Sequence, residues 1–295
     1  MENRINEIDK TRIKTDKITL LIKDILAKKE LANLNPEFIL EKVKIFLNNH
    51  KKAENKLEQN KFSEFKRSKE HKELMKHVRA ELREIYGVFI LKGYEKRYKL
   101  LEELKKDPSL ENHNQILNLH KSSKERLPYY SIVYKRIIEI TGKPKRIVDL
   151  ACGLNPISYP YLGFKPDYIA CDLAEKDLEF IQKYFDLMNI KGKTKKIDLI
   201  NEITDNLASL TKKDDLVLLF KALDSLEAIQ RNISSVILQS LKAKQIVVSF
   251  STQSLGGRKA IKKEKRNWFS RVAENLNFKI SSFEIPNEMF YVLTR

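Results

Sequence analysis

The chain has little cysteine, glycine and proline for its length, and it lacks any long apolar run. Of its 295 residues, two are cysteine, eight are glycine and eight are proline. No apolar stretch approaches the roughly 20 residues of a membrane-spanning helix. The first residues carry no apolar core of an export signal. We therefore expect a cytoplasmic protein that no segment anchors in a membrane.

The two cysteines, Cys152 and Cys171, each lie inside an apolar run. Free cysteine behaves as a small hydrophobic residue, and reduced thiols are the rule in reducing compartments. We therefore expect two buried thiols, and we expect no metal site. We also expect a monomer.

What the chain has in excess is positive charge. The formal net charge is +17, with 42% hydrophobic and 33% charged residues. The composition is that of a folded globular protein. A basic excess of this size favours a polyanionic partner, nucleic acid or an anionic membrane surface. The alternative is a generally lysine-rich proteome. Both halves of the chain are basic, so a charged tail is not the source.

The composition changes near residue 141, which predicts two domains, residues 1–140 and 141–295. Apolar residues in the first part recur at intervals of three and four, as in amphipathic helices. Asn35-Pro36 is placed to start a helix, and Asp107-Pro108 to end one. We interpret this part as a helical, basic domain for binding RNA or the ribosome. Its basic clusters over residues 51–79 are equally compatible with a solvated helix face.

Short apolar runs alternate with amphipathic segments after residue 141. Such runs, separated by helices, are typical of a mostly parallel sheet that is covered on both faces. The last two runs predict an antiparallel pair. The sequence thus predicts a doubly wound α/β domain with an all-helical N-terminal extension. The predicted strands are Arg146–Cys152, Asp167–Leu173, Thr194–Ile200, Asp215–Phe220, Gln245–Phe250, Phe278–Ile285 and Met289–Leu293, and the clearest helices are Glu175–Met188 and Ser225–Leu241.

A glycine turn and three acids follow the first three predicted strands. Gly153 comes where the chain must turn sharply, and a residue without Cβ lets a ligand approach the backbone. Asp149, near the end of the first strand, can accept hydrogen bonds from turn amides or face a cationic ligand. Asp172 ends the second strand, about 20 residues after the turn, where an acid holds ribose hydroxyls. Asp198, at the end of the third strand, can face an adenine amino group. The alternative is three solvent-facing loop acids.

The motifs that bind phosphates are missing. The chain has neither G-x-G-x-x-G nor a P-loop, so a dinucleotide or nucleoside triphosphate is disfavoured. A nucleoside without phosphates suits a turn with one glycine better. S-adenosylmethionine is the common cofactor of this kind, and we predict that this chain binds it.

The stretch "DLACGLNP" (149–156) resembles the 16S ribosomal RNA methyltransferases of aminoglycoside resistance, which modify N7 of a guanine in the decoding site. Further stretches agree in order with that family and extend the resemblance over residues 120–295. The resemblance implies a Rossmann-like class I methyltransferase domain. Ala151, Ser251 and Gln253 depart from the family pattern, which has glycine, proline and a basic residue there. The further stretches are "HKSSKERL" (120–127), "LLFKALDSLE" (218–227), "VVSFSTQSLGGRK" (247–259) and "PNEMFYVLTR" (286–295).

The resemblance also implies roles for cofactor-binding residues. Arg126 would face the methionine carboxylate, since a guanidinium fork suits a carboxylate; the alternative is a helix-surface arginine paired with a neighbour. His120 would lie nearby, or be a structural histidine. Lys221 would point into the pocket, or cap a strand end. The full predicted cofactor-binding set is His120, Arg126, Asp149, Ala151, Gly153, Asp172, Leu173, Asp198, Leu199 and Lys221.

RNA contacts are predicted beyond the fifth strand. The basic loop after Gly256-Gly257 can clamp phosphates of a folded RNA, or it can be the solvated start of a helix. Asn287 and Glu288, from the family's closing strand, would hold the target base. The predicted RNA-binding residues are Arg258, Lys259, Lys262, Lys263, Arg266, Asn287 and Glu288.

The function that the resemblance implies is S-adenosylmethionine-dependent methylation of 16S ribosomal RNA within the small ribosomal subunit. Guanine N7 carries an in-plane lone pair, so no general base is required and no catalytic base is predicted. The alternative is a non-catalytic RNA-binding or ribosome-assembly protein that kept the fold. A small-molecule methyltransferase is disfavoured, because a small substrate needs no basic extension.

Overall fold

The computed structural model describes residues 15–201, 204–253 and 266–295, without the side chains of residues 204 and 205. It divides into two compact units, Met1–Val88 and Phe89–Arg295. This division differs from the predicted boundary at residue 140, which lies inside the second unit. The reason is packing, because apolar side chains from helices before residue 141, such as Leu104 and Ile116, share one core cluster with the strands.

Helices alone form the described part of the first unit. Asn35 caps the helix that starts at Pro36, with its side chain accepting from the Glu37 amide at 2.7 Å, which confirms the predicted start. Ile39 and Val43 on this helix, like Leu74 and Val78 on the helix Lys69–Ile85, are fully buried. The elements are a helix over residues 15–26, η1 (Lys29–Leu31), α2 (Pro36–Asn49), α3 (Lys51–Gln59), α4 (Phe62–Phe65), α5 (Lys69–Ile85) and η2 (Gly87–Phe89), which reaches the second unit.

The second unit begins with a run of helices that leads into the sheet. The first α-helix of this run ends before Asp107-Pro108, as the sequence predicts. Across the described ranges, no helix is both long and apolar enough to cross a membrane. The elements are η3 (Tyr94–Lys96), α6 (Arg97–Lys106), α7 (Leu110–Leu117), α8 (Lys121–Arg126), η4 (Leu127–Tyr129) and α9 (Tyr130–Thr141).

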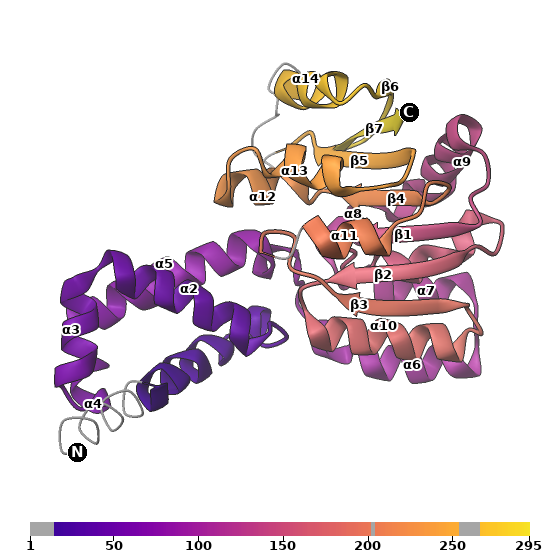
Figure 1. The fold of residues 1–295 in the computed structure, drawn as a ribbon. Helices are drawn as coiled ribbons and strands as arrows, with labels where there is room; N and C mark the ends of the chain where they lie inside the picture. Colours follow the sequence, from indigo (N-terminus) through magenta and orange to yellow (C-terminus); the bar gives the residue numbers. More distant parts are fainter. Residues whose placement is uncertain (1–14, 202–203, 254–265) are drawn as a thin grey trace. The chain divides into compact units, whose positions relative to one another are not determined.

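A seven-stranded sheet forms the centre of this unit, in the order β3-β2-β1-β4-β5-β7-β6. The first five strands are parallel, and β6 and β7 form the predicted antiparallel pair at one edge (Figure 1). The doubly wound α/β fold is thereby confirmed. The strands are β1 (Arg146–Leu150), β2 (Asp167–Asp172), β3 (Gly192–Lys196), β4 (Leu216–Phe220), β5 (Gln245–Ser251), β6 (Lys279–Ile285) and β7 (Glu288–Thr294).

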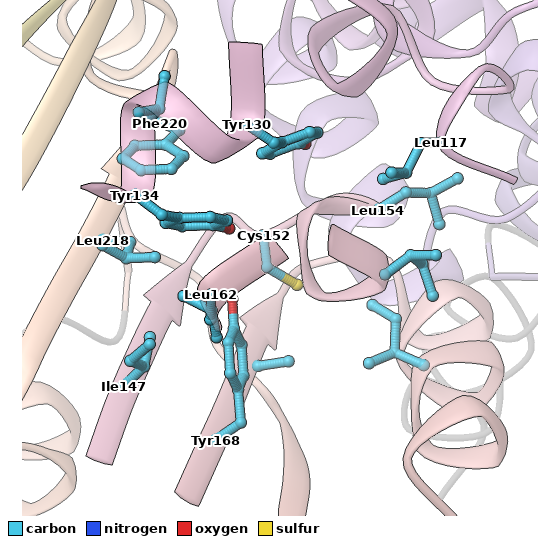
Figure 2. Packing of buried hydrophobic residues seen from close by; sticks show 14 of the residues in the cluster. Leu117, Tyr130, Tyr134, Ile147, Cys152, Leu154, Leu162, Tyr168, Leu218 and Phe220 are labelled. Carbon is cyan, nitrogen blue, oxygen red and sulfur yellow. The ribbon is translucent and has the colours of Figure 1, made fainter. Parts of the chain in front are cut away.

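Alternating residues of the central strands enter two separate cores. Ile147 of β1 and Leu218 of β4 belong to one cluster, whereas Val148 and Val217, one residue along, belong to the other. This alternation places one core on each face of the sheet. In the first core, the rings of Tyr130 and Tyr134 from α9 lie near Cys152 and Phe220, just after β1 and at the end of β4 (Figure 2). Both cysteines are buried free thiols, as predicted.

Helices on the two faces complete the unit. The elements are η5 (Asn155–Leu162), α10 (Glu175–Leu187), α11 (Thr204–Leu210), α12 (Leu223–Ile229), α13 (Ile233–Ser240) and α14 (Asn267–Asn275). The first face carries η5 and α10 with the helices before the sheet, and the second carries α11, α12, α13 and α14. The predicted helix 225–241 is in fact two helices, because Asn232 adopts a left-handed backbone (φ 66°) and Glu227 accepts from the Asn232 and Ser234 amides.

The strand order reverses between β1 and β4. The chain runs outward from β1 to β3, then returns to place β4 on the other side of β1. Ligands of doubly wound sheets bind beyond the carboxyl ends of the strands at such a reversal. The carboxyl ends of β1, β2 and β4 therefore define the candidate site.

Candidate active site at the carboxyl edge of the sheet

The turn after β1 is held by an acid from β2. Gly153 has a left-handed backbone (φ 50°), and its amide donates to Asp172 Oδ2 at 2.9 Å. The other oxygen of Asp172 accepts from the Leu173 and Ala174 amides at 2.8 and 3.0 Å. Asp172 thus accepts three backbone hydrogen bonds, and the one from Gly153 joins the ends of β1 and β2. The glycine turn and the acid at the end of β2, both singled out in the sequence, are thus in direct contact, and the ribose contact of Asp172 stays a prediction.

His120 explains why the turn needs glycine. A Cβ placed on Gly153 would lie 2.8 Å from Cε1 and 2.9 Å from Nε2 of His120. The imidazole cannot easily retreat, because it is 8% exposed and stacks on Phe89 with ring centroids 5.6 Å apart. Burial, assisted by the charges of Arg126 and Lys221, lowers the pKa of His120 to about 3. His120 is therefore a neutral ring that shapes the turn.

Asp149 lies inside the protein rather than at its surface. Its Oδ2 accepts from Tyr168 OH at 2.7 Å and from Asn155 Nδ2 at 2.9 Å. Its Oδ1 is buried and has no hydrogen-bond partner. Burial raises the pKa of Asp149 to about 6, although both hydrogen bonds oppose the shift. An acceptor left unpaired at the edge where ligands bind is a candidate contact for a donor on a ligand.

The Asp149→Asn variant is expected to be more stable than the wild type above pH 6. The pKa of Asp149 is about 6 in the folded protein and about 3.9 in an unfolded chain. Its stabilising contribution is therefore complete below about pH 3.9 and is lost as the pH rises through 6. Asparagine keeps an oxygen for Tyr168 and Asn155 and carries no charge. We expect a gain of about 1–3 kcal/mol at pH 8 and none at pH 4. Urea unfolding at both pH values measures it, and equal gains would contradict the explanation.

Two neighbouring strands end in a strained residue. Ala151 after β1 and Lys221 after β4 both have positive φ, 53° and 55°. Such a backbone costs a residue with a Cβ about 1–2 kcal/mol, and strain of this kind gathers at functional sites. Alanine in place of the family's glycine thus fits at this position but at an energetic cost.

Replacement of Ala151 by glycine is expected to stabilise the protein by about 0.5–1 kcal/mol. The relief of backbone strain exceeds the extra entropy that glycine brings to the unfolded chain. Urea midpoints measure the gain. Ala174→Gly is the control, because Ala174 has a negative φ of −83° and is fully buried, so that this change should destabilise. A shift in the same direction for both variants would contradict the assignment of strain to Ala151.

Arg126 is the centre of a buried polar network. The side chain at the end of α8 is 1% exposed, so the alternative of a helix-surface arginine is wrong. Its Nη2 donates to Glu288 Oε1 at 2.7 Å and its Nη1 to Asn155 Oδ1 at 3.0 Å. Burial opposes the charge, but Glu288 more than compensates and raises the pKa of Arg126 above its usual value. Arg126 is therefore a permanent cation beside the glycine turn.

Lys221 joins the same network from the end of β4. Its Nζ lies 2.6 Å from Glu125 Oε2 and 3.3 Å from Glu288 Oε2. Its backbone amide donates to Ser249 of β5. The side chain therefore points inward, toward the network, and does not cap the strand end.

Asp198, the acid after β3, is bonded within its own loop, whereas Asp172 is bonded to the glycine turn. The strand β3 ends at Lys196, earlier than predicted. It consists of a lysine-rich stretch, which an edge strand favours and which an apolar pattern does not reveal. Asp198 accepts from the Ile200 and Asn201 amides. Leu199 is 7% exposed and packs in the second core, whereas Leu173 is half-buried beside Asp172. Asp198 and Leu173 border the carboxyl edge, and Leu199 supports it from within.

The predicted RNA contacts other than Glu288 divide into three groups. Arg258, Lys259, Lys262 and Lys263 lie outside the described residues. Arg266 pairs with Asp224 at 2.5 Å and covers the Phe250 ring, so its guanidinium is used within the protein. Asn287 is half-exposed in the turn between β6 and β7, and its carbonyl accepts from the Thr252 amide.

The direct RNA contact predicted for Glu288 is corrected by its position. The carboxylate is 1% exposed and accepts from Arg126 and Ser249. Burial raises its pKa, but the charges of Arg126 and Lys221 outweigh burial and lower it. The residue that sequence reasoning assigned to the base therefore belongs to the Arg126 network.

The residues at this edge fit S-adenosylmethionine. Asp172 uses three of about four lone-pair sites for backbone amides, which leaves one for a ribose hydroxyl. The buried, unpaired oxygen of Asp149 and the guanidinium of Arg126 supply an acceptor and a cation beside the same turn. A nucleoside with a zwitterionic tail needs groups of these kinds.

Sequence reasoning missed several members of the site. Asn155 bridges Asp149 and Arg126, and Tyr130 OH donates to the same Asn155 oxygen. Asn155 was visible in the "GLNP" stretch, and Tyr130 lies one helical turn after Arg126. Ser249 carries no sequence signal of this role, since it lies in the middle of an apolar strand.

Comparison with known proteins gives a consistent result. The profile of a family described as "Ribosomal RNA methyltransferase (FmrO)" matches residues 64–292. A protein of Micromonospora rosea named "16S rRNA (guanine(1405)-N(7))-methyltransferase" is 29% identical over 231 residues, 74% of this chain and 81% of that protein. A protein of the same name from Proteus mirabilis is 29% identical over 246 residues, 76% of this chain and 85% of its own length.

Solved structures agree with the sequence matches. A crystal structure of the 16S rRNA methyltransferase RmtF in complex with S-adenosyl-L-homocysteine aligns with a TM-score of 0.76 at 25% identity. The alignment covers 95% of this chain and 98% of that one. The structure of the 16S rRNA methylase RmtB aligns with a TM-score of 0.67 over 94% of this chain and supports the fold.

Proposed function

The chain belongs to the ribosomal RNA methyltransferase (FmrO) family, and we propose that it transfers the methyl group of S-adenosylmethionine to N7 of one guanine of 16S ribosomal RNA. The relatives named above act on guanine 1405, and we propose the equivalent nucleotide here. The substrate would be the small ribosomal subunit in the cytoplasm. The basic character of the chain, with a net charge of +17, supports a polyanionic substrate.

One observation carries this proposal. A buried arginine contacts Asn155 of the same turn whose Gly153 amide is bound by Asp172. The turn, the acid and the cation come from three separate segments, and the sheet brings them to one edge at the strand reversal. A non-catalytic RNA-binding protein has no need of this arrangement, so the catalytic interpretation is preferred.

The residues act by positioning. When bound, the cofactor supplies an electrophilic methyl group on a sulfonium. Asp172 would hold the ribose, and Arg126 would hold the methionine carboxylate. Guanine N7 has an in-plane lone pair and attacks without losing a proton, so none of these residues is required as a base. His120 is neutral at any physiological pH, and it has a structural task in shaping the turn.

RNA recognition is proposed for groups outside the buried network. The target base must leave its stack to reach the methyl group, and the half-exposed Asn287 is the candidate to hold its edge. The basic residues between Arg258 and Lys263 would contact phosphates. Because folded RNA is read mainly by shape, we propose an assembled subunit as the substrate. Equal transfer to naked 16S RNA and to subunits would contradict this last point.

Methyl transfer to purified small subunits tests the proposal. With tritiated S-adenosylmethionine, the wild type should label 16S RNA, and Asp172→Ala should not. The matched control is Asp167→Asn, at the opposite end of the same strand, where the carboxylate pairs with the exposed Lys191. It should label like the wild type. An absence of label with the wild type, on subunits shown to be unmodified, would contradict the proposed function.

A further inference from the structure

Glu288 occupies an unusual place for an acid. It starts β7, pairs in register with Ser251 at the end of β5, and is 1% exposed. Its Oε1 accepts from Ser249 Oγ at 2.5 Å, and its Oε2 lies 3.3 Å from Lys221 Nζ. Burying a carboxylate is costly unless it is paired. Because burial of this carboxylate is unfavourable, its position favours a function that requires Glu288 here.

The guanidinium of Arg126 is divided between two kinds of partner. Its Nε and Nη2 donate to Glu288, at 3.2 and 2.7 Å. Its Nη1 donates to neutral oxygens, Asn155 Oδ1 at 3.0 Å and Tyr130 OH at 3.4 Å. The remaining Nη2 hydrogen reaches Ser122 Oγ at 3.1 Å. All five N–H groups of the arginine are therefore engaged.

The hydrogen bonds on the two edges of the Arg126 guanidinium differ in strength. Hydrogen bonds to a carboxylate are shorter and about twice as strong as those to neutral acceptors. The Nε–Nη2 edge therefore stays bound to Glu288 when a ligand binds. The Nη1 edge is the one that a second carboxylate can take over, because that carboxylate displaces only an amide oxygen and a hydroxyl, which also bond to each other.

We propose that Glu288 is a positioning residue that holds the Nε–Nη2 edge of Arg126 and thereby presents the Nη1 edge to the methionine carboxylate of the cofactor. This inference rests on the proposed function, which supplies the cofactor. In this proposal Glu288 contacts Arg126 and does not contact RNA. The closing strand β7 thereby contributes to recognition of the amino-acid part of the ligand.

Two ligands separate this role from general support of the fold. S-adenosylhomocysteine carries the carboxylate, and 5′-methylthioadenosine has the same nucleoside without the amino-acid part. Glu288→Gln preserves side-chain size, but it places an amide NH2 against an arginine donor and removes the charge. Calorimetric titration of the full chain should show affinity for S-adenosylhomocysteine falling about tenfold or more, with affinity for 5′-methylthioadenosine unchanged.

Controls make each outcome informative. Glu284→Gln, an exposed acid on the neighbouring strand β6, should change neither affinity. If Glu288→Gln does not fold, Glu288→Asp keeps the charge but shortens the side chain, and it should show a smaller loss with the same selectivity. An equal loss for both ligands would overturn the inference and indicate general support of the fold.

Two further results would also overturn it. Unchanged affinity for S-adenosylhomocysteine together with reduced methyl transfer to subunits would return Glu288 to RNA recognition. A wild type that binds neither ligand would refute the proposed function itself, and the inference with it. The failure of the inference alone is recognised by a wild type that binds S-adenosylhomocysteine normally.

Discussion

The Arg126→Met variant is expected to unfold with a free energy about 3–5 kcal/mol lower than that of the wild type, because it leaves a buried acid without its main partner. Glu288 would keep only Ser249 and Lys221, the latter at 3.3 Å. Methionine fills a similar volume, so the loss comes from the charge rather than from a cavity. The same variant should lose methyl transfer, since the cation for the methionine carboxylate is gone.

Tryptophan fluorescence in urea measures this change selectively. The chain has one tryptophan, Trp268, which packs against the core of the second unit, so its signal follows the unit that contains Arg126. Adding Glu288→Gln to the variant removes the unpaired charge and should restore at least half of the lost stability.

A surface ion pair provides the reference. Lys191 pairs with Asp167 at 2.7 Å in the same unit, but its side chain is 83% exposed. Lys191→Met should therefore cost no more than about 1 kcal/mol. If Arg126→Met costs no more than Lys191→Met, the buried network does not contribute as the structure indicates.

Gly153→Ala is expected to remove cofactor binding and to destabilise the second unit by about 2–5 kcal/mol. The backbone there is left-handed, at φ 50°, which costs alanine about 1–2 kcal/mol. The new methyl group would also lie 2.8 Å from His120, and overpacking of this kind costs about 1–3 kcal/mol. Relief of the clash moves the turn away from Asp172, and calorimetric titration with S-adenosylhomocysteine detects the loss.

Gly163 offers a control that separates backbone strain from the clash. Its backbone is equally left-handed, at φ 72°, but a Cβ added there would meet no atom within 4 Å. Gly163→Ala should cost about 1–2 kcal/mol and leave ligand binding intact. In Gly153→Ala, the additional change His120→Ala should recover part of the stability. Equal effects of the two glycine variants would show that the His120 contact does not constrain the turn.

The sequence predicts the sheet well because its strands are marked by strong local patterns. β1, β4 and β5 read as apolar runs, since both faces of these strands are buried. β3 was placed too late, because an edge strand tolerates lysine and its pattern is therefore weak. The domain boundary differed for another reason: helices before residue 141 contact the sheet through side chains, and such long-range packing leaves no local signal.

The residues of the candidate site also differ in whether a local sequence pattern predicts them. Gly153 and Asp172 were predictable, because a turn and an acid at fixed spacing follow from parallel-strand geometry. The partners of Arg126 were not, because Glu288 lies 162 residues away in the sequence. The resemblance to the family's closing strand assigned Glu288 to the target base. Only the fold shows that two cations meet it in the interior.

The central claim is methylation of guanine N7, and the position of the transferred methyl group tests it most directly. Small subunits treated with the wild-type enzyme are to be extracted, and their 16S RNA reduced with borohydride and cleaved with aniline, which breaks the chain at 7-methylguanine. We expect one new cleavage, at the guanine equivalent to 1405, that is absent after treatment with Asp172→Ala. Transfer of labelled methyl into 16S RNA without any such cleavage would contradict the claim.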